Sequence, residues 1–282
     1  MTAPSTLLEL AREVASGAGE LLRRSLPAVA GGRLLAEGAT AKSSPTDLVT
    51  EIDRASEALI VGALLRARPN DAIVGEEGSS REGSTGVTWV IDPLDGTINY
   101  LYGIPVFAVS IAARAAGRSV AGVVHNPLTG EMYAAAEGEG ASLNGNELRL
   151  EATGRPLGEA LVGTGFSYRA QTRAAQAQLL PTLLPAVRDI RRGGAAALDI
   201  CAVACGRLDA FYEAGLEPWD LAAGEVIARE AGATVKVLEG LTAGAATVVV
   251  AAPGLEAGLV QLLERAASGE GLGPRAGVTS SR

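Results

Sequence analysis

The stretch Trp89-Val90-Ile91-Asp92-Pro93-Leu94-Asp95-Gly96-Thr97 places two aspartates, three residues apart, directly after an apolar run that predicts a strand over 87–91. If the chain turns into a helix after this strand, the two carboxylates can converge while the amides of Gly96 and Thr97 stand at the start of the helix. Carboxylates bind hard divalent cations such as Mg²⁺, and free amides at a helix start suit a phosphate group. A helix-capping role would explain one aspartate, but the whole hexapeptide 92–97 favours a metal site.

Two further acidic segments lie beside predicted strands or helices. Glu76 and Glu77 follow a short predicted strand, 72–74, where exposure to solvent alone would explain them. Asp220 lies in Trp219-Asp220-Leu221-Ala222-Ala223-Gly224, at the start of a helix of small residues that can pack closely. This setting favours a buried aspartate, which needs a partner such as a metal ion, and a simple helix N-cap is the alternative.

A fourth segment runs from Lys42 to Asp53 and predicts a loop at 41–46 followed by a helix over 47–67. Asp47 is placed to cap this helix. Thr50 and Asp53 lie three residues apart, so they share one face of the helix. The segment therefore adds a carboxylate on a helix face to the candidate acidic residues.

Composition excludes several classes of protein. The chain has 282 residues, with 24 basic and 32 acidic side chains and a formal net charge of −8. An acidic chain without basic blocks argues against nucleic-acid binding, and no apolar run reaches the roughly 18 residues of a membrane span. The N-terminal residues show no signal-peptide pattern, and the single histidine, His125, argues against a Ser-His-Asp triad. We expect a cytoplasmic protein, with no nucleic-acid or membrane partner, whose catalysis depends on carboxylates.

The spacing of apolar residues predicts a mixed α/β (α+β) fold. The pattern changes near 150–155, which predicts a subdomain boundary, and the Gly- and Ser-rich residues 268–282 predict a disordered tail. The first part has a helix at 7–22, strands at 107–114, 119–125 and 131–137, and a hairpin turn at Asn144-Gly145. The second part alternates strands at 160–163, 189–191, 208–212 and 247–251 with helices at 172–187 (interrupted by Pro181 and Pro185), 195–205, 221–231 and 255–267.

The four acidic segments, in this order, resemble the inositol monophosphatase family of Mg²⁺-dependent, lithium-sensitive phosphomonoesterases. Residues 89–99 match the family signature W-x-[IV]-D-P-[IL]-D-G-T-x-N, and residues 219–223 match the stretch W-D-x-A-[AG]. Residues 122–145 follow the family pattern of a Gly-Val-Val strand, an E-M-Y-x-A strand and a G-x-G-A-x-x-N-G turn. The resemblance implies a layered αβαβα sandwich, a single domain over 1–267 with subdomains of about 1–152 and 153–267.

The resemblance also implies the residues of the site, with two to three Mg²⁺ ions as cofactors. The first ion would be held by Glu76, Asp92, the Leu94 carbonyl and Asp95, and the second by Asp92, Asp95 and Asp220. The implied catalytic residues are Thr97, which would position the attacking water, Asp53, which would orient Thr97, and Glu76, which would also help bind a third, weaker ion. The implied substrate contacts are Asp95, Gly96, Thr97, Gly194, Ala195, Ala196, Glu213 and Asp220, with Lys42 as a further basic candidate.

The pocket for the leaving alcohol departs from the family pattern. Ala195 stands where related sequences often carry Thr or Ser, which removes one hydroxyl from this side of the site. The pair Arg191-Arg192 is more basic than an inositol phosphate needs. Phe166 and Tyr168 belong to a loop that either shapes this pocket or lies outside it.

We expect Mg²⁺-dependent hydrolysis of a small phosphate monoester by a metal-activated water, without a covalent intermediate. Myo-inositol 1-phosphate is the first candidate, and fructose 1,6-bisphosphate, histidinol phosphate and 3′-phosphoadenosine 5′-phosphate are alternatives that relatives hydrolyse. A non-catalytic metal-binding scaffold or regulatory protein is the alternative of another class. The resemblance further implies a phosphorylated polyol or sugar as the partner, a homodimer and sensitivity to lithium.

Overall fold

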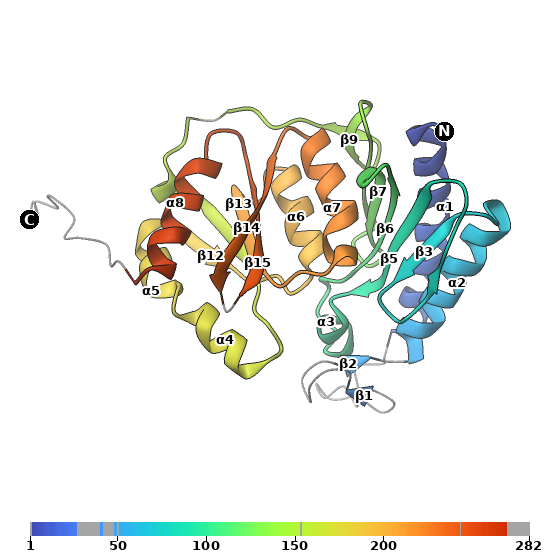
Figure 1. Cartoon of the computed structure of the whole chain (residues 1–282), viewed down its shortest axis with the longest axis horizontal. Helices are drawn as coiled ribbons and strands as arrows, with labels where there is room; N and C mark the ends of the chain where they lie inside the picture. Colours follow the sequence, from blue (N-terminus) through green and yellow to red (C-terminus); the bar gives the residue numbers. More distant parts are fainter. Residues whose placement is uncertain are drawn as a thin grey trace, which may run out of the picture.

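The computed structural model describes residues 2–26, 40–41, 48–49, 51–152, 154–242 and 244–269. Three layers of helices alternate with two large sheets across these residues, so the predicted αβαβα sandwich is confirmed (Figure 1). Lys42, Asp47, Thr50 and residues 270–282 of the predicted tail lie outside the described ranges. Within those ranges, no helix is long and apolar enough to cross a bilayer.

The first sheet positions the acidic segments. Among the described residues its strands are β3 (Ala72–Gly75), β4 (Ser80–Arg81), β5 (Val87–Asp95), β6 (Ala108–Ala115), β7 (Arg118–Asn126), β8 (Glu131–Ala136), β9 (Gly140–Leu143) and β10 (Asn146–Leu148). They lie in the order β10-β9-β8-β7-β6-β5-β3-β4. β3 and β5 are parallel, which brings their carboxyl ends, and therefore Glu76 and Asp92, to the same edge of the sheet.

Two helices cover the outer face of this sheet. α1 (Pro4–Arg24) buries Leu7, Ala11 and Val14 at the predicted helical spacing. α2 (Glu51–Ala67) begins later than the predicted residue 47, because residues 48 and 49 form strand β2 (Leu48–Val49), which pairs with β1 (Thr40–Ala41). Packing of α2 against β5 turns Asp53 inward, where it is buried.

The middle layer consists of α6 (Ala196–Ala204) and α7 (Pro218–Glu230), which lie between the two sheets (Figure 1). Their small residues permit close packing, as the sequence predicted. A Cβ on Gly122 of β7 would lie 2.8 Å from the Ala223 carbonyl oxygen, and a Cβ on Gly224 would lie 2.9 Å from Ile200. Gly122 therefore lets α7 approach the first sheet, and Gly224 lets α6 approach α7.

The second sheet has the strand order β12-β11-β13-β15-β14 in the described part of the chain. Its strands are β11 (Leu161–Thr164), β12 (Asp189–Arg191), β13 (Ala210–Ala214), β14 (Thr234–Thr242) and β15 (Ala245–Ala251). The sequence did not predict β14, because this edge strand exposes most of its side chains and so lacks the apolar pattern of a buried strand. In the sequence, the strands of the first large sheet precede residues 149–160 and those of the second follow them. The division of the chain into two subdomains stays a prediction.

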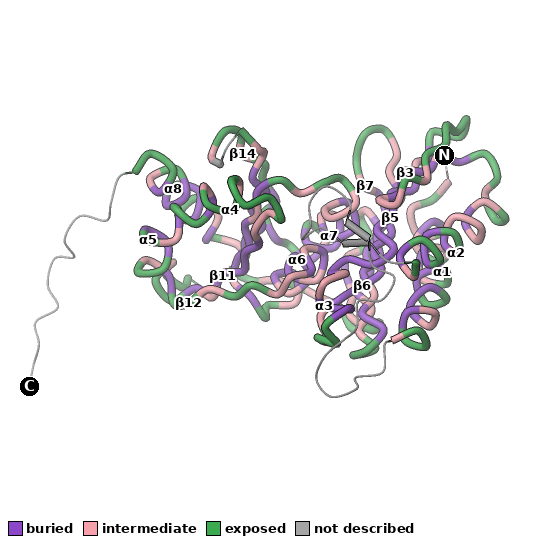
Figure 2. Tube along the Cα trace, turned by 90° about the horizontal axis from the view of Figure 1, so that it is seen from below, coloured by how far each residue is buried: buried purple, intermediate pink, exposed green. Residues whose placement is uncertain are grey.

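The outer face of the second sheet is covered by α4 (Ala170–Ala177), α5 (Leu180–Leu183) and α8 (Glu256–Ala267). The predicted interruption of the helix over 172–187 is confirmed, because Pro181 and Pro185 each stand in the first turn of a new short helix, α5 and η2 (Leu184–Ala186). A single turn, η1 (Leu157–Glu159), precedes β11. Figure 2 shows exposed residues along the outer helices and buried residues in the strands and in the helices between them.

Candidate active site

The turn at 92–97 has the geometry that the sequence suggested. β5 continues past Pro93 to Asp95 with an irregular register against β6, and helix α3 (Thr97–Leu101) begins two residues later. Gly96 adopts a left-handed conformation with φ 88°, and a Cβ there would lie 2.9 Å from the Val106 carbonyl oxygen. This strand-to-helix turn therefore requires glycine at position 96.

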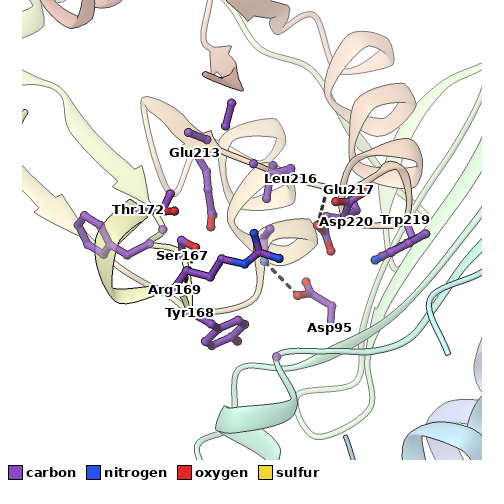
Figure 3. Close-up of a pocket in the computed structure, with 18 of the residues that line it drawn as sticks. Asp95, Ser167, Tyr168, Arg169, Thr172, Glu213, Leu216, Glu217, Trp219 and Asp220 are labelled. Carbon is purple, nitrogen blue, oxygen red and sulfur yellow. Dashed lines mark hydrogen bonds between the residues drawn. The ribbon is translucent and has the colours of Figure 1, made fainter. Parts of the chain in front are cut away.

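Asp92 and Asp95 lie at the two ends of the irregular part of β5. The Asp92 Oδ1 accepts a hydrogen bond from the Leu94 amide at 3.0 Å. The Asp95 carboxylate accepts the amide of Ala196 at 3.2 Å (Figure 3) and that of Ala197 at 2.8 Å, at the start of α6. Asp95 therefore joins the first sheet to a helix whose residues come about a hundred positions later.

Thr97 is held by two acceptors. Its Oγ1 lies 3.0 Å from the Asp53 Oδ1 and 3.2 Å from the Leu94 carbonyl oxygen. A hydroxyl has one proton to donate, and its lone pairs remain able to accept a hydrogen bond. The structure therefore contains the hydrogen bond through which Asp53 was predicted to orient Thr97.

Glu76 follows β3, and its amide donates to the Ile91 carbonyl oxygen at 3.1 Å. This bond fixes Glu76 beside the residue that precedes Asp92. Asp220 approaches from α7, where it is not the N-cap but the third residue of the helix, and its side chain takes part in a capping box with Glu217. The Glu217 side chain accepts from the Asp220 backbone, and the Asp220 carboxylate accepts the Glu217 amide at 2.8 Å. The N-cap alternative for Asp220 is therefore wrong by position, and its predicted burial is only partial.

The electrostatics of these carboxylates show an excess of negative charge. Burial raises the pKa of Asp92 well above its ordinary value, and repulsion from Glu76, Asp95 and Asp220 raises it further. The pKa of Asp220 rises to about 8 through burial and repulsion from Asp95. Burial also raises the pKa of Asp95 to about 7, although the Ala197 amide opposes the rise.

A divalent cation would fit this set of donors. Oxygen ligands from clustered carboxylates suit Mg²⁺, and the charge of a cation would offset the repulsion that raises these pKa values. Within the described ranges no group of three Asp, Glu, His or Cys side chains is already arranged to hold an ion. The case for a metal therefore rests on the charge and chemistry of the donors.

A cavity of about 830 Å³ opens beside the carboxylates. Figure 3 shows Asp95 and Asp220 on one side and Glu213, Tyr168 and Arg169 across from them. Phe166 and Tyr168 both line this cavity, and their contact with a substrate stays a prediction. The residues that line the cavity are Glu76, Asp95, Gly96, Gly165, Phe166, Ser167, Tyr168, Arg169, Thr172, Arg192, Gly194, Ala196, Glu213, Ala214, Gly215, Leu216, Glu217, Trp219, Asp220, Gly244 and Ala245.

Several predicted site residues stand behind this wall rather than in it. Asp53, Asp92 and Leu94 are buried and contact the site through the turn at 92–97. Ala195 is also buried, and its neighbours Gly194 and Ala196 are the ones that face the cavity. The hydroxyl that Ala195 lacks would therefore stand behind the wall in this structure.

Glu213, at the end of β13, faces the cavity from the second sheet. It lies against Gly165, where any Cβ would overlap its carboxylate. Burial raises the pKa of Glu213 to about 8, with repulsion from Asp220 and Asp199, while the Arg192 guanidinium opposes the rise. Arg192 thus places a positive charge near Glu213, on the side of the cavity formed by the second sheet.

Two residues that hold the turn at 193–194 were not predicted from the sequence. The Asn99 Nδ2 donates to the Gly193 carbonyl oxygen at 3.0 Å and to the Val106 carbonyl oxygen at 2.7 Å. Asp199, whose pKa burial raises to about 6, accepts the amides of Gly193 and Gly194. Asn99 ends the matched signature, which was the available signal, whereas Asp199 lies inside a predicted helix where nothing marks it.

Comparisons with known proteins show which proteins the chain is similar to. The model of the inositol monophosphatase family matches residues 3–268. The inositol-1-monophosphatase SuhB of Mycobacterium tuberculosis is 46% identical over 274 residues, which cover 93% of this chain and 94% of that protein. The Nus factor SuhB of Escherichia coli is 44% identical over 69% of this chain and 73% of its own length.

Solved structures match at the level of the fold as well. The structure of M. tuberculosis SuhB superposes with a TM-score of 0.78 at 42% identity, covering 94% of this chain and 98% of that one. An IMPase of Thermotoga maritima superposes with a TM-score of 0.81 at 30% identity, covering 94% and 100%. A Staphylococcus aureus IMPase with bound 2′-AMP superposes with a TM-score of 0.75 at 29% identity, covering 94% and 97%.

Proposed function

The chain is a phosphomonoesterase that belongs to the inositol monophosphatase family, and from that premise we propose that it hydrolyses myo-inositol 1-phosphate to inositol and phosphate with Mg²⁺. One observation carries the proposal. Four carboxylates, from β3, β5 and α7, face one another closely enough to raise the pKa of Asp92 together with its burial. A cation-dependent reaction on a phosphate explains that arrangement, since buried like charges are otherwise unfavourable.

The proposed metal ligands follow the resemblance. Glu76, Asp92, the Leu94 carbonyl and Asp95 would hold one Mg²⁺, Asp92, Asp95 and Asp220 a second, and Glu76 would share a third, weaker ion. When bound, the ions would activate a water and stabilise the leaving oxygen. The Asp95 carboxylate can accept the two α6 amides and still offer lone pairs to a cation, because each of its oxygens has two.

Thr97 and Asp53 would orient the attacking water. Because the Thr97 hydroxyl donates to the Asp53 Oδ1, its oxygen is left to accept a hydrogen bond from water. Asp53 is buried, which fixes the direction of that hydroxyl. The amides of Gly96 and Thr97, where α3 begins, would hold the phosphate oxygens.

The far side of the cavity would receive the leaving alcohol. Glu213 would accept hydrogen bonds from hydroxyl groups of the polyol or sugar, and Gly194 and Ala196 would form the surface against which it packs. Arg192 and the 165–169 segment add positive charge and two aromatic rings to this side. Fructose 1,6-bisphosphate, histidinol phosphate and 3′-phosphoadenosine 5′-phosphate remain alternatives, and the relative with bound 2′-AMP adds a nucleotide to them.

Phosphate release in Mg²⁺ tests the proposal across these five esters. We expect the highest kcat/KM with myo-inositol 1-phosphate, and a loss of more than about 100-fold in Asp95→Asn, because a metal ligand supplies several kcal/mol of transition-state stabilisation. Preference for another ester would keep the metal chemistry and reject the substrate. Absence of turnover with all five esters would favour the non-catalytic alternative. The next function to test would then be that of a Nus factor, the name that the Escherichia coli relative carries.

Three further properties are proposed on the same premise. Lithium should inhibit turnover by competing at the site of Asp220, which a titration with LiCl measures. The protein should be a homodimer, with twice the mass of the chain in light scattering. It should occur in the cytoplasm, which cell fractionation tests.

A further inference from the structure

Helix α2 has a buried polar face beside the proposed active site. Asp53, Ser56 and Glu57 are 1%, 0% and 3% exposed. Positions three and four apart lie on one side of a helix, so these side chains point together toward β5 and the end of β3. Buried polar groups need hydrogen-bond partners, and each of these three side chains forms a hydrogen bond with one of the acidic segments.

Ser56 contacts the turn that carries the two aspartates. Its Oγ donates to the Pro93 carbonyl oxygen at 3.0 Å. Pro93 lies between Asp92 and Asp95, in the part of β5 where the register against β6 is irregular. Proline has no amide proton to donate to β6, and the chain is held here through the Pro93 carbonyl oxygen, to which Ser56 donates.

Glu57 contacts the other acidic segment. Its two carboxylate oxygens accept the amides of Glu77 at 2.8 Å and Ser79 at 2.9 Å. The close approach needs Gly75, because a Cβ at that position would overlap the Glu57 carboxylate. Glu76 is therefore tied on one side by its own amide to Ile91 and on the other by the neighbouring amide to Glu57.

We propose that Ser56 and Glu57 are positioning residues, which hold the Glu76 and Asp92–Asp95 segments at a fixed spacing relative to Asp53 and Thr97. The proposal rests on the proposed function, since it assigns these two side chains to the alignment of the metal ligands. One helix thereby sets three parts of the site at once, through one side chain for each. Neither residue touches the cavity.

The competing explanation is that these bonds only stabilise the fold. Asp71 provides the matched control, because it is a buried carboxylate of the same sheet at the opposite end of β3 and β5. It accepts hydrogen bonds from Trp89 Nε1 at 2.9 Å, from Thr85 and from Arg68. Asp71→Asn should lower stability as a Glu57 variant does, but without touching the acidic segments.

The test compares Glu57→Gln, Glu57→Leu and Ser56→Ala with Asp71→Asn and the wild-type protein. Mg²⁺ affinity is measured by calorimetry without substrate, amide hydrogen exchange is followed at Glu77 and Ser79, and kcat and KM are measured with the best ester. We expect Glu57→Leu to weaken Mg²⁺ binding about tenfold, the lower end for loss of a group that supports metal ligands. Glu57→Gln keeps one acceptor oxygen and should be intermediate, and Ser56→Ala should weaken binding about threefold by loosening only the Pro93 peptide.

The expected pattern separates positioning from stability. Exchange at Glu77 and Ser79 should rise in the Glu57 variants alone, kcat should fall with Mg²⁺ affinity, and the KM for the ester should change less than about twofold. Equal loss of Mg²⁺ affinity in Asp71→Asn would overturn the proposal, as would unchanged affinity in Glu57→Leu and Ser56→Ala. If the wild-type protein itself binds no Mg²⁺, the proposed function fails together with the positioning role, and the calorimetry shows this before any variant is compared.

Discussion

Two buried aspartates at opposite ends of the same strands behave in opposite ways. Asp71, before β3, has a lowered pKa because hydrogen bonds from Arg68, Thr85 and Trp89 outweigh the effect of burial. Asp92, near the end of β5, has a raised pKa because burial acts together with the repulsion of other carboxylates. At the Asp71 end of the sheet, protein groups balance the buried negative charge. The Asp92 end has an excess of negative charge. The fold can therefore hold a buried carboxylate in its charged form at one end, and the excess of negative charge at the other end suits a cation.

The largest expected effect is the loss of activity when the charge of Asp92 is removed. Asp92→Asn should lower kcat/KM about 1000-fold, because it removes a bridging metal ligand worth several kcal/mol in the transition state. The same change should leave the unfolding midpoint in EDTA unchanged or higher, since it relieves repulsion and the Asn oxygen can still accept the Leu94 amide. Kinetics and thermal unfolding on one preparation measure both.

Asp71→Asn should show the reverse of this behaviour. It should lower stability by about 2 kcal/mol through the loss of charge-assisted hydrogen bonds, with kcat/KM within about twofold of wild type. A large loss of kcat/KM in Asp71→Asn would contradict the contrast between the two aspartates. Strong destabilisation by Asp92→Asn would contradict it as well.

The next effect concerns the hydroxyl beside the acidic end. Thr97→Val keeps the shape of the side chain and removes the donor to Asp53, so we expect kcat to fall about 100-fold through loss of an oriented water. Thr97→Ser should retain most of the activity, since it keeps the hydroxyl. Equal activity of the Val and Ser variants would show that the hydroxyl has no part in the reaction.

A smaller effect is expected on the far wall of the cavity. At a pH above 8, where the Glu213 carboxylate is ionised, Glu213→Gln should raise the KM for myo-inositol 1-phosphate about tenfold, because it weakens a charge-assisted hydrogen bond to a substrate hydroxyl. kcat should change less than KM, because Glu213 stands apart from the 92–97 turn. Arg192→Met serves as the comparison, and a larger effect there than in Glu213→Gln would assign recognition to the positive charge instead.

The smallest effect is a difference in pH dependence. The folded pKa of Glu213 is raised from 4.5 to about 8, so the folded state binds the extra proton between these values. Its contribution to stability is present at low pH and is lost as the pH rises toward 8. Glu213→Gln should therefore flatten the fall in unfolding free energy between pH 5 and 8.

Asp71 should give the opposite sign, because its folded pKa lies below 3.8. Its contribution is present above pH 3.8 and is lost as the pH falls below that value. The stability gap between Asp71→Asn and the wild-type protein should therefore close in acid. Denaturant titrations across pH check both slopes, and slopes of the same sign for the two variants would contradict the contrast.

The sequence predicted the elements of the site better than their connections. The apolar run before Asp92 and the glycine at 96 are local signals, and they indicated the strand and the turn correctly, while the metal-binding role of the carboxylates stays a prediction. The bond from Asp95 to the start of α6 joins residues about a hundred positions apart, which no local period can reveal. Glu57 reads as an ordinary polar residue on an amphipathic helix, and its burial depends on the packing of α2 against β5.

The bond between Asp95 and α6 also has a consequence during synthesis of the chain. The strand that carries Asp95 leaves the ribosome about a hundred residues before the amides of Ala196 and Ala197, and Asp220 follows later still. Domains of this kind form their long-range contacts late, after the intervening segments have emerged. A nascent chain that stops before α7 would contain Asp92 and Asp95 but would lack Asp220, the last carboxylate of the cluster. Asp95, the start of α6 and Asp220 can therefore be brought together only after α7 has emerged.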